Sequence, residues 1–168
     1  MRTRFAPLVV VAALLLASCS DDAPEEPTAQ QTTDAECSAM IPDAVFTTLG
    51  WTPTVDGGAI TVRGCRRQAP QGYIEVRRRS ASFETVCATL DRTGTPGPGV
   101  PAPWLGDGVK ACAVEPDPVK GQHTGQTKVV VSEGKRQILQ IFVAALSDTP
   151  PANVRTAVTQ LLEANPKT

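Results

Sequence analysis

The chain begins with a short apolar segment that ends close to a cysteine and is followed by acidic residues. Arg2 and Arg4 precede this segment, which consists of the ten residues 8–17 (LVVVAALLLA). Ten apolar residues are too few to cross a bilayer comfortably, and the positive start is typical of a secretory signal peptide. We therefore expect residues 1–18 to be a signal and the remainder to fold outside the cytoplasm, where disulfides form. A retained transmembrane helix is disfavoured because residues 20–22 (SDD) end the apolar run.

The residues around the first cysteine, Leu16-Ala17-Ser18-Cys19, resemble the lipobox of bacterial lipoproteins. This resemblance implies a diacylglyceryl thioether on Cys19, cleavage before it, and acylation of the new amino group with a fatty acid such as palmitate. Stable anchoring takes about two acyl chains, which such a cysteine carries. The expected location is therefore the extracytoplasmic face of the cell membrane, with the lipid as anchor. An ordinary secretory signal with Cys19 merely nearby is the alternative.

Composition divides the rest of the chain into two parts. Residues 19–36 begin with the lipidated cysteine and continue as SDDAPEEPTAQQTTDAE, without aromatic, Val, Ile, Leu, Lys or Arg residues. Such a segment cannot bury enough apolar surface to offset the entropy of ordering, so we expect a flexible acidic spacer. Residues 37–168 have the length of one ordinary domain.

Four further cysteines, Cys37, Cys65, Cys87 and Cys112, lie within this domain. An even number in an exported domain indicates two disulfides, for which three connectivities exist. We predict Cys37–Cys65 and Cys87–Cys112, because each pair would join a helical segment to a nearby strand. A metal site is the weaker alternative, since zinc ligands favour close spacings such as C-x-x-C.

Apolar periodicity predicts an α+β domain. The predicted helices open near Pro42 and Pro151, with a third over residues 83–90 capped by Ser80 or Ser82, and Gly50 and Gly94 are the expected ends of two of them. Alternation predicts strands over 59–67, 72–79, 109–114, 127–133 and 136–144, whereas the Pro-rich residues 95–103 should lack regular structure. We expect an antiparallel sheet of about five strands, stapled by disulfides, with two or three helices packed on one face.

The predicted domain contains three short motifs, Cys37-x-x-Met40-Ile41-Pro42, Leu49-Gly50 and Gly64-Cys65. Together they resemble small actinobacterial lipoproteins that are grouped as a domain family of unknown function. The resemblance implies an envelope location and supports pairing of Cys37 with Cys65. It brings no catalytic residues.

The distribution of arginine gives the clearest indication of a binding surface. Arg63 and Arg67 are expected on one face of the strand 59–67, and Arg77 and Arg79 on one face of its hairpin partner together with Tyr73. Side by side these residues would attract phosphate or carboxylate groups, with Tyr73 as an aromatic platform. The alternative is that the solvent-facing side of a sheet simply carries charged residues.

No constellation in the sequence predicts catalysis. His123 is the only histidine and lies in a loop rich in Gly and Gln, and neither a Walker loop nor a dinucleotide fingerprint is present. We therefore expect no enzyme activity, no catalytic residue, no bound metal and no cofactor. The net charge of −1 gives no reason to expect a nucleic-acid partner.

These observations favour a lipid-anchored, non-enzymatic binding or interaction module. Its expected partners are the membrane, through the lipid anchor, and an envelope protein or anionic envelope component. The latter would dock on the arginine hairpin and the Pro-rich loop. A carrier or sensor that holds a small apolar ligand between sheet and helices is the first alternative. An envelope hydrolase that uses His123 is the second.

Overall fold

The computed structural model describes residues 34–54, 59–61, 64–92, 95–96, 99–116 and 125–167. For residues 59–61, 91–92 and 95–96 only the backbone is described. The signal and lipidation predictions at Cys19, the predicted binding residue Arg63 and the loop residue His123 lie outside the described residues.

A seven-stranded antiparallel sheet forms the centre of the domain, with strand order β1-β2-β3-β9-β8-β7-β6. Its strands are β1 (Ala59–Thr61), β2 (Gly64–Ala69), β3 (Gly72–Ser80), β6 (Val100–Pro101), β7 (Ala111–Val114), β8 (Gly125–Ser132) and β9 (Gln137–Ala145). A separate two-stranded sheet consists of β4 (Asp91–Arg92) and β5 (Thr95–Pro96). Two antiparallel meanders, β1 to β3 and β6 to β9, thus meet where β3 pairs with β9.

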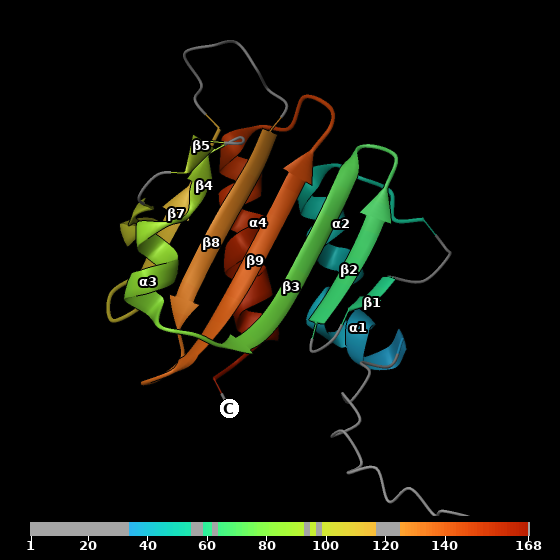
Figure 1. The fold of residues 1–168 in the computed structure, drawn as a ribbon. Coiled ribbons are helices and arrows are strands. Elements are labelled where there is room, and N and C mark those ends of the chain that lie inside the picture. The colour runs from blue at the N-terminus through green and yellow to red at the C-terminus, as the bar shows by residue number, and fades with distance from the viewer. Residues whose placement is uncertain are drawn as a thin grey trace, which may run out of the picture.

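Helices lie on both faces of this sheet (Figure 1). Three of them, α1 (Asp34–Met40), α2 (Asp43–Leu49) and α4 (Pro151–Ala164), cover one face, which we call the helical face. The short helix α3 (Phe83–Ala88) lies on the other face, over β7 and β8. The α+β class, the antiparallel sheet and the packing of helices on one face are confirmed. α1 is an additional helix, and the predicted helix α3 lies on the second face and not with the others.

Two apolar clusters follow from the alternation of side chains along the strands. Beneath the helical face, Ile74 and Val76 of β3 and alternate residues of β9 pack against α2 and α4, as the amphipathic stripe of α4 predicts. On the second face, Val130 and Ile138 pack beneath α3 with Leu90. Nearly all of β9 is buried, because both of its faces are covered.

The helix boundaries follow local backbone chemistry. Gly50 ends α2 at φ +72°, a left-handed conformation that glycine adopts without steric cost, as predicted. Ser82 caps α3 by accepting a hydrogen bond from the Thr85 N–H at 3.3 Å. α3 ends at Ala88, well before Gly94, so the predicted end of this helix was wrong.

Two strand predictions also need correction. Residues 59–67 do not form one strand, because Thr61 pairs with Gly64 and the chain reverses between β1 and β2. The sequence pattern does not reveal this reversal, because the apolar alternation runs up to Gly64 and a glycine has no side chain whose polarity would mark a turn.

The Pro-rich segment 95–103 is not devoid of regular structure, since it contains β5, β6 and the 3-10 helix η1 (Pro103–Leu105). Pro101 lies on an edge strand and Pro103 in a first helical turn, where the missing N–H costs little.

Both disulfides predicted from the sequence are present. Cys37–Cys65 joins α1 to β2 on the helical face, with Cα atoms 5.2 Å apart. Cys87–Cys112 joins α3 to β7 on the second face, with Cα atoms 6.1 Å apart. Two of the short helices, α1 and α3, are therefore held covalently to the sheet faces on which they pack.

Several contacts close the domain at its C-terminal end. Arg78 contacts both carboxylate oxygens of Glu133 at 3.1 Å and donates to the carbonyls of Asn165 and Pro166. Asn165 in turn donates to the carbonyl oxygen of Met40 at 2.8 Å.

Among the helices of the described residues, none is long and apolar enough to cross a membrane.

The disulfide connectivity can be tested by peptide mapping. Cleavage after Lys and Arg places each of the four domain cysteines on a separate peptide, so non-reducing mass spectrometry should find only Cys37–Cys65 and Cys87–Cys112 links. Replacing Cys87 and Cys112 together by Ala should lower the free energy of unfolding by about 2–5 kcal/mol, because a 25-residue loop is released. A Cys37–Cys87 link would contradict the structure.

Candidate functional site

The candidate site lies on the second face of the sheet, beside the part that α3 covers. Strand register sets its composition: Arg66 is opposite Glu75, Glu75 is opposite Phe142, and Arg77 is opposite Gln140. Because alternate residues share a face, Tyr73 and Arg79 of β3 lie on it as well. We call this surface the arginine face; its residues are Arg66, Tyr73, Glu75, Arg77, Arg79, Gln126, Lys128, Gln140 and Phe142.

Glu75 is the central residue of the arginine face and is only 4% exposed. Its Oε2 accepts hydrogen bonds from Arg66 Nε at 3.0 Å and from Arg66 Nη2 at 2.6 Å. Its Oε1 lies 3.3 Å from Arg77 Nε. One buried carboxylate therefore contacts two guanidinium groups: Arg66 through two charge-assisted hydrogen bonds, and Arg77 through an ion pair that lacks hydrogen-bond geometry at Nε. The bond to Glu75 raises the pKa of Arg66 above its usual value.

Each of the two guanidinium groups lies over an aromatic ring. The Arg66 guanidinium carbon is 4.4 Å from the centre of the Tyr73 ring, and that of Arg77 is 4.8 Å from the centre of the Phe142 ring. Each such contact contributes about 0.5–1 kcal/mol at an exposed site. The side chains of Arg66 and Arg77 are nevertheless 37% and 40% exposed, so their outer N–H groups face solvent.

The face carries a positive charge overall. Arg79 is exposed and adds one cation along β3, and Lys128 adds another from β8 opposite Phe142. Within the described strands of this face, four cations thus accompany one carboxylate. The arrangement suits an anionic ligand, because guanidinium groups held by a carboxylate and a ring need little further ordering to bind.

Two polar atoms on this face are buried without a hydrogen-bond partner. They are Arg77 Nε and Gln140 Oε1, which belong to directly paired residues of β3 and β9. Gln140 is only 5% exposed. A buried acceptor without a partner costs about 1–3 kcal/mol, so its position in the middle of the sheet destabilises the free protein.

The structure brings together only part of the predicted arginine cluster. Tyr73, Arg77 and Arg79 share a face, as predicted, and Arg63 lies outside the described residues. The predicted placement of Arg67 beside them was wrong. Arg67 pairs with Ile74 and points to the helical face, where Nη1 donates to the Ile41 carbonyl at 2.6 Å.

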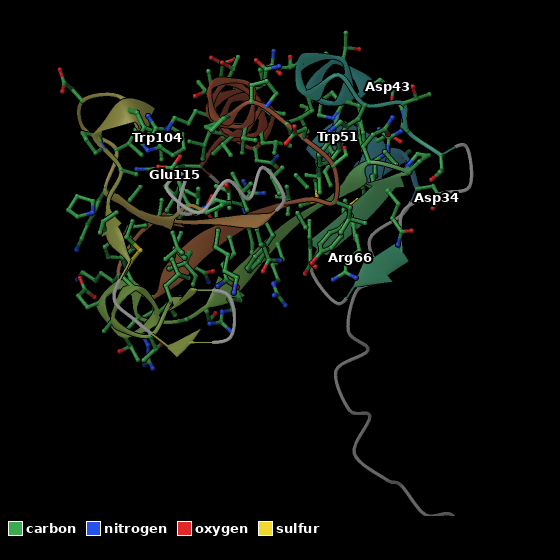
Figure 2. All side chains as sticks on the ribbon, turned by 90° about the horizontal axis from the view of Figure 1, so that it is seen from above. Asp34, Asp43, Trp51, Arg66, Trp104 and Glu115 are labelled. Atoms are coloured by element: carbon green, nitrogen blue, oxygen red, sulfur yellow. A yellow bond between two sulfur atoms is a disulfide. The ribbon has the colours of Figure 1, made fainter. Side chains whose placement is uncertain are left out.

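Further contacts of Arg67 show that it fixes the helices to the sheet. Its Nη2 lies 2.7 Å from Asp43 Oδ1, and its guanidinium lies over the Phe46 ring. Figure 2 shows Asp43 and Arg66 on opposite sides of the sheet. Arg67 is therefore engaged with α2 and with Ile41, which links α1 to α2, and is unavailable to a ligand on the arginine face.

Sequence reasoning missed Arg66, and the signal that could have found it is the cysteine beside it. Cys65 must face the helices in order to bond Cys37, so strand alternation sends Arg66 to the opposite face and returns Arg67 to the helical one. The assumption of an unbroken strand from residue 59 obscured this alternation.

Helix α3 forms one border of the arginine face and is fixed by an ion pair as well as by its disulfide. Lys110 Nζ lies 2.6 Å from Glu84 Oε1 and close to the Phe83 ring. The hydrogen bond from Lys110 lowers the pKa of Glu84 to about 2. Glu84 is thus ionised at any physiological pH, which places a negative charge beyond the edge of the basic surface.

Within the described ranges, no three His, Cys, Asp or Glu side chains lie together as metal ligands would. No protein-family model, curated protein or solved structure matches this chain. The arginine face is therefore interpreted from its own chemistry.

The role of Glu75 can be tested by a double-mutant cycle with Arg66. Glu75→Ala should lower the free energy of unfolding by about 1–3 kcal/mol, because two arginines lose their shared acceptor. Arg66→Ala should cost less, since its side chain is partly solvated. Urea denaturation of both single variants and the double variant should give a coupling energy of about 1 kcal/mol. Strictly additive effects would show that the pair contributes nothing.

Proposed function

We propose that this chain is a lipid-anchored protein of the cell envelope whose arginine face binds an anionic envelope component without catalysing a reaction. The observation that supports this most directly is the geometry of Arg66 and Arg77. Both guanidinium groups rest on aromatic rings, contact one carboxylate, and retain exposed N–H groups.

The N–H groups of Arg66 that do not bind Glu75 explain why an anion can bind to this face. A guanidinium has five N–H donors, and Arg66 uses its Nε and one Nη on Glu75. The remaining donors form a planar fork that matches carboxylate or phosphate oxygens. Because the Tyr73 ring and two hydrogen bonds to Glu75 already restrict Arg66, less conformational entropy is lost when it binds an anion.

The lipid anchor would determine where such binding takes place. The chain from Cys19 to Asp34, where the described domain begins, can extend over at most about 50 Å. A domain tethered in this way can turn its arginine face toward the membrane surface or toward envelope material above it. The tether keeps the domain near either one at a high effective concentration.

The anchor is tested by Cys19→Ser in the natural host. The wild-type chain should fractionate with membranes and incorporate an alkyne-labelled fatty acid. The variant should lose the label and its lipid-dependent association with the membranes, because serine cannot form the diacylglyceryl thioether and no acyl chain is then attached. Equal labelling of both proteins would show that Cys19 is not the modified residue.

Anion binding is tested by charge reversal on the arginine face. Heparin fragments serve as the probe, and the affinity is measured by isothermal titration at several salt concentrations. The variant R66E/R77E/R79E should bind at least about tenfold more weakly, equivalent to about 1.4 kcal/mol, and with a smaller salt dependence. R66Q/R77Q/R79Q, which avoids placing three new carboxylates beside Glu75, should be weakened in the same direction.

The matched control is K135E/R136E/K167E, which changes the net charge equally at exposed positions. This variant should retain most of the wild-type affinity. If the control loses as much affinity as the reversal on the arginine face, the binding depends on net charge alone, and the proposal for the arginine face fails.

A further inference from the structure

Gln140 is a buried residue of the arginine face that anion binding by Arg66 and Arg77 does not explain. Its Oε1 has no hydrogen-bond partner, although the side chain is 95% removed from solvent at the centre of the sheet. Its direct cross-strand partner is Arg77, whose Nε is likewise buried without a hydrogen bond. An unpaired acceptor thus belongs to the residue directly opposite an arginine that would hold an anion.

We propose that the arginine face recognises an acidic carbohydrate or polyol, in which a hydroxyl group lies next to a carboxylate or phosphate. Arg77, together with Arg66, binds the anionic group, and the neighbouring hydroxyl donates a hydrogen bond to Gln140 Oε1. This inference rests on the proposed function and narrows its ligand from any anion to a hydroxyl-bearing one.

The chemistry of the two unpaired atoms leads to this class. An ionised carboxylate or phosphate oxygen only accepts hydrogen bonds, so a simple anion can satisfy Arg77 but leaves Gln140 Oε1 unpaired. A sugar acid offers both an acceptor and a donor, because its ring carries free hydroxyl groups within two carbons of the one that bears the carboxylate. Arg77 and Gln140 lie directly opposite each other on paired strands. The donor of one and the acceptor of the other are therefore close enough to bind neighbouring groups of a single sugar acid.

Neutral polar groups further along the arginine face provide additional hydrogen-bond donors and acceptors for hydroxyl groups. Tyr73 and Gln126 both lie opposite Ala144, whose small side chain lets them meet, and Gln126 Nε2 donates to Tyr73 Oη at 2.9 Å. Tyr73 Oη keeps its own hydrogen and Gln126 keeps its amide oxygen for further hydroxyl groups. Alternating guanidinium, amide and phenol groups suit a ligand with several hydroxyls better than they suit a bare polyanion.

Gln140 is buried in the ligand-free protein, and Arg77 is the residue directly opposite it on β3. The Arg77 side chain is 40% exposed and rests on Phe142 without a hydrogen bond at Nε. The inference therefore requires Arg77 to move aside from Gln140 when the ligand binds, while Arg66 keeps its contacts with Glu75 and Tyr73. The ligand hydroxyl then occupies the space beside Gln140 that the arginine stem leaves.

The experiment compares ligands that differ only in the groups concerned. The probes are trigalacturonate, which carries carboxylates and hydroxyls; a neutral galactose trisaccharide; tricarballylate, which carries carboxylates alone; and myo-inositol 1-phosphate. Wild-type protein should bind trigalacturonate or inositol phosphate more tightly than the other two. Preference between these two identifies the anionic group as carboxylate or phosphate.

Gln140→Leu separates a binding role from a structural one. The affinity for the preferred hydroxylated anion should fall about tenfold, whereas the affinity for tricarballylate should not change. The thermal midpoint of the ligand-free variant should stay the same or rise, because an unpaired buried acceptor is removed. Gln137→Leu, the same change at an exposed position of β9 on the other side of the sheet, should leave the affinity for both ligand types unaltered.

Three results would overturn this inference. They are equal wild-type affinity for hydroxylated and simple anions, unaltered sugar-acid binding by Gln140→Leu, and equal weakening of both ligand types by that variant. If R66E/R77E/R79E still binds heparin more weakly than the wild-type protein, the proposed function is supported even when this inference fails. If that reversal has no effect, the proposed function itself fails.

Discussion

The pairing of β3 with β9 is the interaction on which the rest of the structure depends. It runs for nine residue pairs, from Gly72 opposite Ala145 to Ser80 opposite Gln137, and joins segments that are separated by 57 residues even at their nearest end. A slip of one residue would exchange the two faces of β3 and send its charged side chains into the core. The close approach at Gly72 opposes such a slip, because a Cβ there would overlap the Ala144 carbonyl and lie 2.6 Å from the Trp51 ring.

This register also produces the arginine face. Glu75 becomes buried because Arg66 on one side and Phe142 on the other lie directly opposite it. A carboxylate in that position is stable only with charged partners, and the two arginines supply them while remaining partly exposed. The same ladder places Gln140 where its acceptor finds no partner within the protein. A stabilising network and an unsatisfied group thus occur side by side, a combination often found at functional sites.

Adjacent arginines on β2 serve opposite purposes. Arg67 holds α2 and the residue before it against the sheet, through Asp43, Ile41 and the Phe46 ring. Arg66, one residue earlier, faces solvent across the sheet and belongs to the proposed binding surface. A basic cluster in a sequence is therefore a poor measure of the surface charge that a ligand meets, since strand alternation divides it between two faces.

Local chemistry in the sequence was sufficient to predict much of the fold. Pro42 and Gly50 bound α2, Ser82 caps α3, and the apolar stripe from Val154 to Leu161 belongs to α4, because capping and periodicity act within a few residues. The disulfide pairs followed from the placement of cysteines on helix and strand. The predicted lipid anchor at Cys19 likewise rests on local sequence alone. Only the tertiary structure decided that the chain reverses before Gly64, that Arg67 faces the helices, and that Gln140 is buried unpaired beside Arg77. Those features depend on which strands become neighbours, and strand pairing over 57 residues leaves no signal in the local pattern.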